Sequence, residues 1–167
     1  PFRGQSVYVH GPEYETIAGI GSNCGIFDPD YIAEMNFYCD TYGLDTISAG
    51  TAIAFAMECT ERGILTRKDT DGIDLRFGNV DGMLEMIRKI AHREGFGDIL
   101  AEGVQRAAQK IGNGSEKFAM HIKGQELPMH DPRGKQGLTL SYAISPTGAD
   151  HIEAPHDTSF LTDTLML

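Results

Sequence analysis

The strongest constraint on how this 167-residue chain can fold is the way glycine ends its apolar periodic segments. Apolar residues recur at helical spacing over four segments, and each segment runs into a glycine. Glycine is the residue that most easily adopts the left-handed conformation with which many helices end. The four stops are Gly43, Gly63, Gly95 and Gly112. The pattern predicts a mainly α-helical body.

The starts of these helices carry capping signals. Asp28 is a capping residue followed by proline at the first helical position, and Asp45 and Asp98 occupy similar positions before later apolar stripes. The four predicted helices run, caps included, from Asp28 to Gly43, from Asp45 to Gly63, from about Val80 to Glu94, and from Asp98 to Gly112.

The segments outside these helices show weaker patterns. The first 25 residues have few helix signals and are predicted to form a short extended piece followed by a loop, and 66–79 is a polar surface connection with room for one short strand. After 115 the pattern changes. Residues 117–124 alternate like a strand, 126–137 form a loop, and 138–144 fit either a strand or a buried helix.

Composition excludes several classes of partner. The net charge of −10 argues against nucleic acid and against an anionic membrane surface. No apolar run approaches the roughly 18 residues of a membrane helix. The three cysteines are an odd number without zinc-site spacing, which favours a cytoplasmic location. The start at Pro1 and the apolar end "TDTLML" lead us to expect a fragment of a longer protein.

Two aspartates frame a predicted helical corner in "DTYGLD". Asp40 lies in the last turn of one helix, and Asp45 is expected to cap the next. The structural interpretation is that both are only parts of the corner. The functional interpretation is that two acceptor-only carboxylates converge on a ligand rich in N–H donors. Spacing alone favours the structural interpretation.

Two loops contain candidate acid–base residues. "GPEYET" places Glu13 and Glu15 beside Tyr14, and a glutamate in an apolar loop can act as a general acid or base. "GADHIEAPHD" gathers acids around His151 and His156, which leaves open a metal site, a proton-transfer histidine or a plain polar loop.

The other candidates have weaker signals. Cys24 could be a reactive thiol or a soft-metal ligand, but a buried inert cysteine is favoured. His92 suits the negative end of its helix. No convincing partners are evident for His10, His121 and His130. The sequence has no P-loop, no dinucleotide fingerprint and no nucleophile elbow.

Taken together in order, several motifs resemble the tungsten-containing aldehyde ferredoxin oxidoreductase family. The resemblance covers nearly the whole chain, as its central segment, through "GPEYET", "GSNCGI", "DTYGLDTISAGTAIAFAME", "REGFGDILAEG", "KGQELPMHDPRG" and "GADH". It implies a fragment of the helical C-terminal domains of that fold. Residues 1–115 would be the later half of a helical cofactor-binding domain, and 116–167 the truncated start of the next, mainly helical domain.

The resemblance also implies site residues. In the family the DxxGLD pattern contacts the pterin of a bis-pterin tungsten or molybdenum cofactor, and here it comprises Asp40, Gly43, Leu44 and Asp45. The family's active-site glutamate corresponds to Glu15.

Further correspondences follow in the later loops. The active-site histidine corresponds to His151, and Asp131 and Arg133 of the "DPRG" loop lie near the cofactor by analogy. Some relatives hold a metal between subunits with acid and histidine residues, for which Glu34 and His92 are conceivable counterparts, although no ExxH pattern is present.

The function implied is oxidation of an aldehyde to a carboxylic acid, with electrons passing through a [4Fe–4S] cluster to ferredoxin. The cluster cysteines of the family lie in motifs that this segment does not contain. A homo-oligomer is expected, without nucleic-acid or membrane partners. Two alternatives remain at this stage: a reductase of aromatic thioesters (benzoyl-CoA type), in which Cys24 could ligate tungsten, and a non-catalytic helical scaffold.

Overall fold

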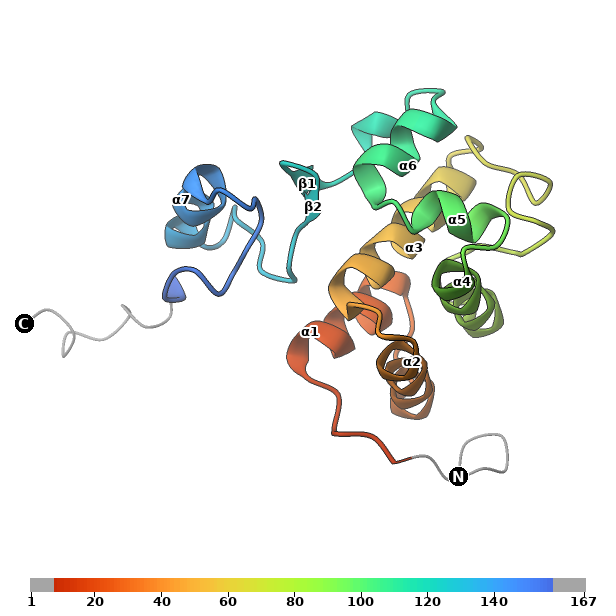
Figure 1. The fold of residues 1–167 in the computed structure, drawn as a ribbon, viewed down its shortest axis with the longest axis horizontal. Coiled ribbons are helices and arrows are strands. Elements are labelled where there is room, and N and C mark those ends of the chain that lie inside the picture. Colours follow the sequence, from red (N-terminus) through yellow and green to blue (C-terminus); the bar gives the residue numbers. More distant parts are fainter. Residues whose placement is uncertain (1–7, 158–167) are drawn as a thin grey trace, which may run out of the picture.

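The computed structural model describes residues 8–157, and these form a helical body with a smaller unit beside it (Figure 1). The extended piece predicted near the start lies partly outside these residues. The helices are α1 (Tyr14–Thr16), α2 (Pro29–Tyr42), α3 (Thr46–Glu61), α4 (Val80–His92), α5 (Phe96–Leu100), α6 (Val104–Ile111) and α7 (Gln136–Ile144). The strands are β1 (His121–Ile122) and β2 (Gln125–Glu126), which pair antiparallel. The mainly helical fold is confirmed.

The body is organised around α3, which is apolar along most of its length. Its buried side chains include Ile53, Phe55 and Met57, and one large apolar core forms around them with residues of α2, α4, α5, α6 and the turns that follow α1. A helix that is apolar on most sides belongs in the interior of a domain. The short π-helical turn Ile17–Gly21 and strand β2 contact α3 as well, so α3 positions much of the surrounding chain.

The corner between α2 and α3 forms as the sequence predicts. Asp28 caps α2 by accepting a hydrogen bond from the Asp30 amide at 2.9 Å. Gly43 ends α2 in the left-handed conformation, with φ of 69°. Asp45 then caps α3, its Oδ2 accepting from the Ser48 amide at 2.7 Å. The starts of α2 and α3 and the reversal between them are therefore specified by residues next to them in the sequence.

The expectation of a loop near the start is wrong, because residues 14–24 are helical. α1 continues into the π-helical turn Ile17–Gly21 and a 3₁₀-helical turn, Ser22–Cys24. This segment packs on α3 with almost no space: a Cβ atom on Gly50 would lie 2.4 Å from the carbonyl oxygen of Gly19. Packing against α3 therefore imposes a helical conformation that local propensity does not signal.

The predicted helix from Asp98 to Gly112 is two helices, and Asp98 is not its cap. Gly103, with φ of 82°, separates α5 from α6. Asp98 lies inside α5 and forms an ion pair with Arg93 at 2.7 Å. The amide of Val104 at the start of α6 donates to the Glu126 carboxylate at 2.7 Å, so the cap of α6 comes from β2.

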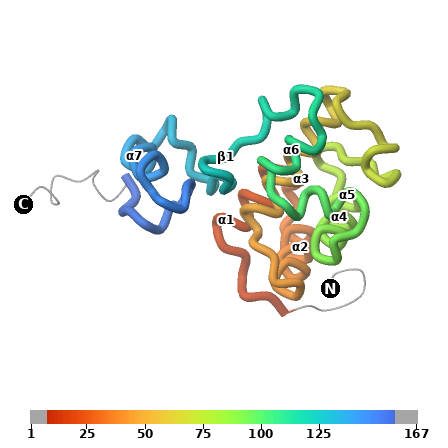
Figure 2. Tube along the Cα trace, turned by 45° about the horizontal axis from the view of Figure 1, so that its top comes forward, coloured from red at the N-terminus to blue at the C-terminus, as the bar shows by residue number. Residues whose placement is uncertain are grey.

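The smaller unit contains the hairpin β1–β2 and helix α7, and the hairpin lies between α7 and the helical body (Figure 2). The strand predicted at 117–124 is reduced to two residues, and 138–144 is helical. Leu138, Tyr142 and Ala149 form a small apolar cluster of their own. In 66–79 there is no strand within the described chain.

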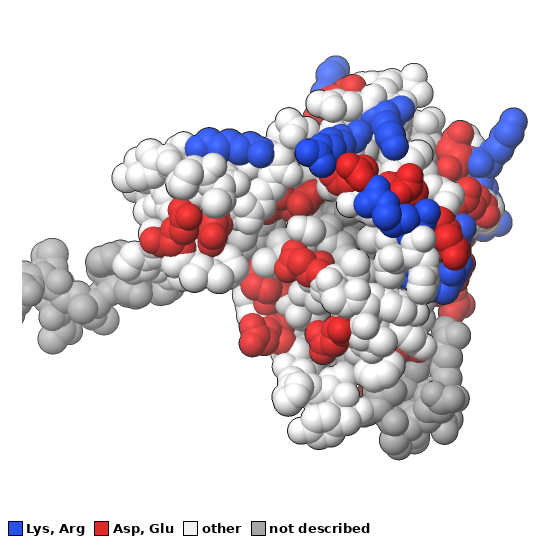
Figure 3. Space-filling view, in the orientation of Figure 1, with Lys and Arg blue, Asp and Glu red and all other residues white. Residues whose placement is uncertain are grey.

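Charged side chains on the visible face are mixed in sign (Figure 3). The arginines of α4 and α6 are paired with acids, as in the contacts of Arg88 with Glu85 and of Arg106 with Glu102, at 2.8 and 3.3 Å. Between residues 8 and 157, no helix combines the length and the apolar character that crossing a bilayer requires.

Candidate functional site

The carboxylate of Glu15 is the centre of the candidate site. Glu15 lies in α1, and its side chain is 15% exposed. Oε2 accepts a hydrogen bond from the Met129 amide at 2.8 Å. Oε1 is buried and has no aligned hydrogen bond. A buried carboxylate oxygen left in this state is energetically costly, so it is a position where a ligand proton would be favourable.

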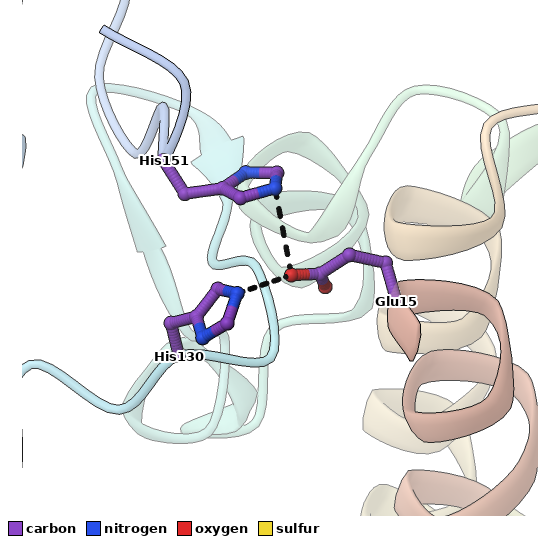
Figure 4. A group of neighbouring side chains, drawn as sticks. All are labelled: Glu15, His130 and His151. Carbon is purple, nitrogen blue, oxygen red and sulfur yellow. Dashed lines mark ion pairs between the residues drawn. The ribbon is translucent and has the colours of Figure 1, made fainter. Parts of the chain in front are cut away.

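Two histidine side chains lie opposite Glu15 and face that oxygen (Figure 4). Nε2 of His130 lies 2.9 Å from Oε1 of Glu15, and Nε2 of His151 lies 3.6 Å from it. Both imidazoles are largely buried, with 13% and 20% of their side chains exposed. The structure thus brings together Glu15 and His151, which are far apart in the sequence, as the resemblance requires.

His130 was missed by the sequence analysis, which found no convincing partner for it. The ring of Tyr14 stacks on His130 with centroids 5.2 Å apart, and the Tyr14 hydroxyl donates to the Met129 carbonyl at 2.7 Å. Adjacent residues of α1 therefore hold the 129–130 segment by backbone and ring contacts. The available signal was the position of His130 inside the "KGQELPMHDPRG" motif.

Burial and neighbouring charges set the protonation of the site. Burial lowers the pKa of His130, the Glu15 carboxylate opposes that shift, and Lys135 adds to it. The pKa of Tyr142 is raised to about 12, first by burial and then by Glu15 and Asp150. His130 is accordingly neutral near pH 7, which suits a hydrogen-bonding role beside a carboxylate.

The positions of Glu15, His130 and His151 test whether this cluster could be a metal site. Within residues 8–157, potential ligand atoms gather at one place, where those of Glu15, His130 and His151 lie within 4.8 Å of one another. Nδ1 of His130, however, lies 3.0 Å from the Lys135 ammonium, which can only donate. Because Nδ1 must accept from Lys135, neutral His130 carries its hydrogen on Nε2. Nε2 then has no lone pair free for a metal, which opposes ligation by that nitrogen.

Glu34 and His92 do not belong to that group. Glu34 is buried in α2 and lines a cavity of about 390 Å³ with residues of α4. His92 lies in the last turn of α4, with its ring edge-on to Tyr42 at 5.3 Å.

The DxxGLD corner lies beside a second concavity. Leu44 and Asp45 line a cavity of about 290 Å³ together with small residues of α3 and the Gly103 turn. Asp40 is exposed and accepts from the Asn36 amide group at 3.3 Å. In each aspartate one carboxylate oxygen has a hydrogen bond and the other has none among the described residues.

The corner and the Glu15 site are coupled through the first turn of α3. The hydroxyls of Thr16 and Thr46 are 2.9 Å apart, so the residue after Glu15 is bonded to the residue after Asp45. The two parts of the candidate site therefore lie at the same end of one rigid helix.

Asp131 and Arg133 follow His130 but face solvent. Arg133 contacts Asp131 at 2.6 Å, with their side chains 90% and 52% exposed. The Arg133 guanidinium lowers the pKa of Asp131 to about 2. Both residues line the apolar groove of about 560 Å³ that runs from α3 to His130.

The cysteines are not placed to ligate a cluster or to react. Cys24, Cys39 and Cys59 are free and buried. Burial raises the pKa of the first two to about 12 and that of Cys59 to about 11. The Cys24 thiol donates to the carbonyls of Gly19 and Gly50 at 3.5 Å. The expectation of an inert buried Cys24 is confirmed.

The helical body thus carries a carboxylate flanked by two imidazoles and, at the same end of α3, an acidic helix corner. Residues 2–163 match the family model described as "Aldehyde ferredoxin oxidoreductase, domains 2 & 3". The chain belongs to this family, and its resemblance to it is confirmed.

Individual relatives agree with this assignment. The chain is 50% identical over 146 residues to the tungsten-containing aldehyde ferredoxin oxidoreductase of Pyrococcus horikoshii, covering 86% of this chain and 24% of that protein. It is 39% identical over 157 residues to a Pyrococcus furiosus protein named "Aliphatic sulfonate oxidoreductase, WOR-like subunit", covering 90% of this chain and 25% of that one. The chain thus spans about a quarter of the length of these relatives.

A solved structure shows the same fold. It is the active-site complex BamBC of benzoyl coenzyme A reductase with 1,5-dienoyl-CoA, at 35% identity and a TM-score of 0.66. The match covers 79% of this chain and 20% of that one. Oxidoreductases with different names therefore share this segment.

Proposed function

We propose that the protein containing this chain oxidises aldehydes to carboxylic acids with a tungsten–pterin cofactor and passes the electrons to ferredoxin. The observation that supports this most is Oε1 of Glu15, which is buried, has no aligned hydrogen bond and lies between two imidazole nitrogens. The similarity to tungsten-containing aldehyde ferredoxin oxidoreductases supplies the chemical context.

The residues present fit a pterin. Pterin rings expose N–H and amino donors, and Asp40 and Asp45 each retain a carboxylate oxygen that has no hydrogen bond among the described residues. Leu44 packs the corner against the core, and Gly43 allows the chain to reverse between the two aspartates. When bound, the cofactor would supply the two-electron oxidation. Asp131 and Arg133 would lie near its edge.

The protein side of the reaction is proton chemistry. Converting a hydrated aldehyde into an acid releases two electrons and two protons. Glu15 would take one of these protons at Oε1 as the hydrated carbon is oxidised, the second would pass to solvent, and His151 would hold the substrate oxygen as a hydrogen-bond donor from Nε2. Met129 holds Glu15 in place by donating its amide to Oε2 at 2.8 Å.

The remaining parts of the proposal lie outside this segment. A [4Fe–4S] cluster would be held by cysteines elsewhere in the protein, since the three described here are buried, unpaired thiols. Ferredoxin would accept the electrons, in the cytoplasm, and the protein would be a homo-oligomer. The division into a cofactor-binding part at 1–115 and the start of another domain at 116–167 belongs to the same proposal.

The test is substitution in the full-length enzyme. Glu15→Gln and His151→Asn should each retain the fold and the cofactor but lower kcat by about 10²-fold or more, the usual effect of losing an acid–base group. The double variant should be much less impaired than the product of the two losses predicts, because the residues act together. Normal turnover in Glu15→Gln would exclude the proposed proton acceptor.

Reduction of an aromatic thioester is the second candidate, favoured by the likeness to the benzoyl coenzyme A reductase complex. The form in which Cys24 ligates tungsten has no support here, because that thiol is buried and bonded to two backbone carbonyls. Assays of the full-length protein with an aldehyde and with an aromatic thioester would separate the two candidates.

A further inference from the structure

Lys135 lies between two of the three clustered histidines. Its Nζ is 3.0 Å from Nδ1 of His130 and 3.5 Å from Nδ1 of His156. The rings of those histidines meet edge to face, with centroids 4.5 Å apart. Lys135 itself is half-buried, directly before α7. One ammonium therefore contacts both rings at the same ring position.

This contact determines which nitrogen of His130 bears hydrogen. A lysine ammonium has three donors and no acceptor, so Nδ1 of His130 must accept. A neutral imidazole has one donor and one acceptor nitrogen, and its hydrogen is then on Nε2. Nε2 is the atom 2.9 Å from Oε1 of Glu15. The hydrogen-bearing nitrogen is thus the ring atom nearest the Glu15 carboxylate, although its N–H is not aligned as a hydrogen bond to Oε1.

The ring of His151 is in a different situation. Its Nε2 lies 3.6 Å from Oε1 of Glu15, and no lysine lies at its Nδ1 among the described residues. Its remaining contacts are with the neighbouring rings, at centroid distances of 5.3 Å to His130 and 5.8 Å to His156. Among the described residues, no contact like that of Lys135 with His130 fixes the tautomer of His151.

We propose that Lys135 is a positioning residue, which keeps the hydrogen of neutral His130 on Nε2 beside Glu15 and leaves His151 as the ring that donates to the substrate oxygen. This inference rests on the proposed role of Glu15 as proton acceptor. Without the ammonium, His130 could take up a second proton. The imidazolium would then pair with Glu15 and make the carboxylate a weaker base.

Tyr14 stacks on the ring of His130 and Tyr142 donates to its carbonyl, and four groups act on its protonation through their charge. They are the carboxylate of Glu15 in α1, the ammonium of Lys135, and the rings of His151 and His156. Only Glu15 favours protonation of His130, while the other three oppose it. Lys135 carries a full positive charge 3.0 Å from Nδ1 of His130 and so opposes protonation of that ring. Without this charge, His130 should protonate at a higher pH.

The test is the pH profile of kcat/KM in the full-length enzyme. Lys135→Met should move the acidic limb upward by about one pH unit, the scale of one neighbouring charge. Lys135→Gln, which keeps an N–H donor without the charge, should move it too. Lys135→Arg, which keeps both, should leave it in place. A limb that stays in place in both neutral variants would overturn the proposal, even if kcat falls uniformly.

A second measurement does not depend on turnover. The ¹⁵N shifts of histidine-labelled enzyme distinguish which ring nitrogen bears hydrogen, with His130→Gln to assign the signal. His130 should be protonated on Nε2 in the parent enzyme and in Lys135→Arg, and should show mixed tautomers or a second proton in Lys135→Met. A parent enzyme with the hydrogen on Nδ1 would refute the inference.

The two proposals fail separately. If Glu15→Gln turns over normally, the proposed proton acceptor is wrong, whatever the Lys135 variants do. If Glu15→Gln is inactive but the pH profile of kcat/KM is the same in the Lys135 variants as in the parent enzyme, only the positioning role is wrong.

Discussion

Asp45 both caps a helix and lines a concavity next to it. Its Oδ2 caps α3 through the Ser48 amide at 2.7 Å, while the residue also lines the cavity of about 290 Å³. Asp40 has no capping role, since within residues 8–157 its carboxylate accepts a hydrogen bond from the Asn36 side chain alone. The structural and functional interpretations of "DTYGLD" are therefore compatible at Asp45 and separable by comparison with Asp40.

Substitutions at Asp45 should separate capping from cofactor binding. Asp45→Ala should lower the free energy of unfolding by about 1 kcal/mol, because α3 loses its cap. Asp45→Asn should cost far less, since asparagine caps as well as aspartate does. Both should lower the tungsten and pterin content of the full-length enzyme, because the charged acceptor is lost.

Thermal unfolding and metal analysis would measure the two effects. Asp40→Ala is the matched control, expected to lower cofactor content without weakening α3. Full cofactor content in Asp45→Asn would show that the corner is structural only.

His130 marks the limit of sequence-based prediction at the residue scale. Glu15 and His151 were predicted through the resemblance, and the structure places both against one another. Nothing local to His130 indicates a partner, because its contacts with Glu15 and Tyr14 cross more than a hundred positions of the chain. Lys135 is closer in sequence, but lysine near histidine has no distinctive spacing.

At the scale of elements, the helices divide by where their caps come from. α2 and α3 are capped by Asp28 and Asp45, which directly precede them, and their boundaries are predicted correctly. α4 is likewise capped by Asn79 directly before it, whereas α5, α6 and α7 start after residues without a capping side-chain hydrogen bond: Gly95, Gly103 and Lys135.

Carboxylates from elsewhere in the chain replace the missing caps. Asp71 accepts from the Phe96 amide at 2.7 Å, Glu126 from Val104 at 2.7 Å, and Asp157 from Gly137 at 2.9 Å. The break between α5 and α6 could not be predicted, because the group that stabilises it lies in β2. Capping rules describe sequence neighbours, and these caps are tertiary contacts.

Glu126 provides a test of these remote caps. It is buried, and its second oxygen accepts from the Ser48 hydroxyl at 3.0 Å. Glu126→Ala should lower the free energy of unfolding by about 1–3 kcal/mol, because the buried Val104 amide loses its acceptor. Glu126→Gln should cost less, since its carbonyl oxygen can still accept.

Denaturant unfolding of these variants would measure the cost. Glu153→Ala removes an exposed acid and should change stability by less than about 0.5 kcal/mol. Equal effects of Glu126→Ala and Glu153→Ala would show that α6 does not need the distant carboxylate.

At the scale of the whole molecule, the two apolar clusters differ greatly in size. The larger cluster extends from Ile20 to Ala108 and includes the interior faces of α2, α3, α4 and α6. The smaller contains Leu138 and Tyr142 of α7 together with Ala149. The candidate site joins the two parts, since Glu15 belongs to the helical body and both histidines to the smaller unit (Figures 1 and 4).

This asymmetry predicts how the isolated 167-residue chain opens. Backbone amides of α7 should exchange with solvent much faster than those of α3, because few buried apolar contacts oppose local opening of the smaller unit. Leu140 and Ile144 of α7 are 62% and 71% exposed, so that helix has little apolar burial to lose. Hydrogen exchange followed by mass spectrometry would compare the two helices directly.

In the full-length enzyme α7 should become protected, as further chain covers its exposed side. Equal protection of α7 and α3 in the isolated chain would contradict a division near 115 and would indicate a single cooperative unit, in which the Glu15–His130 contact is as stable as the core.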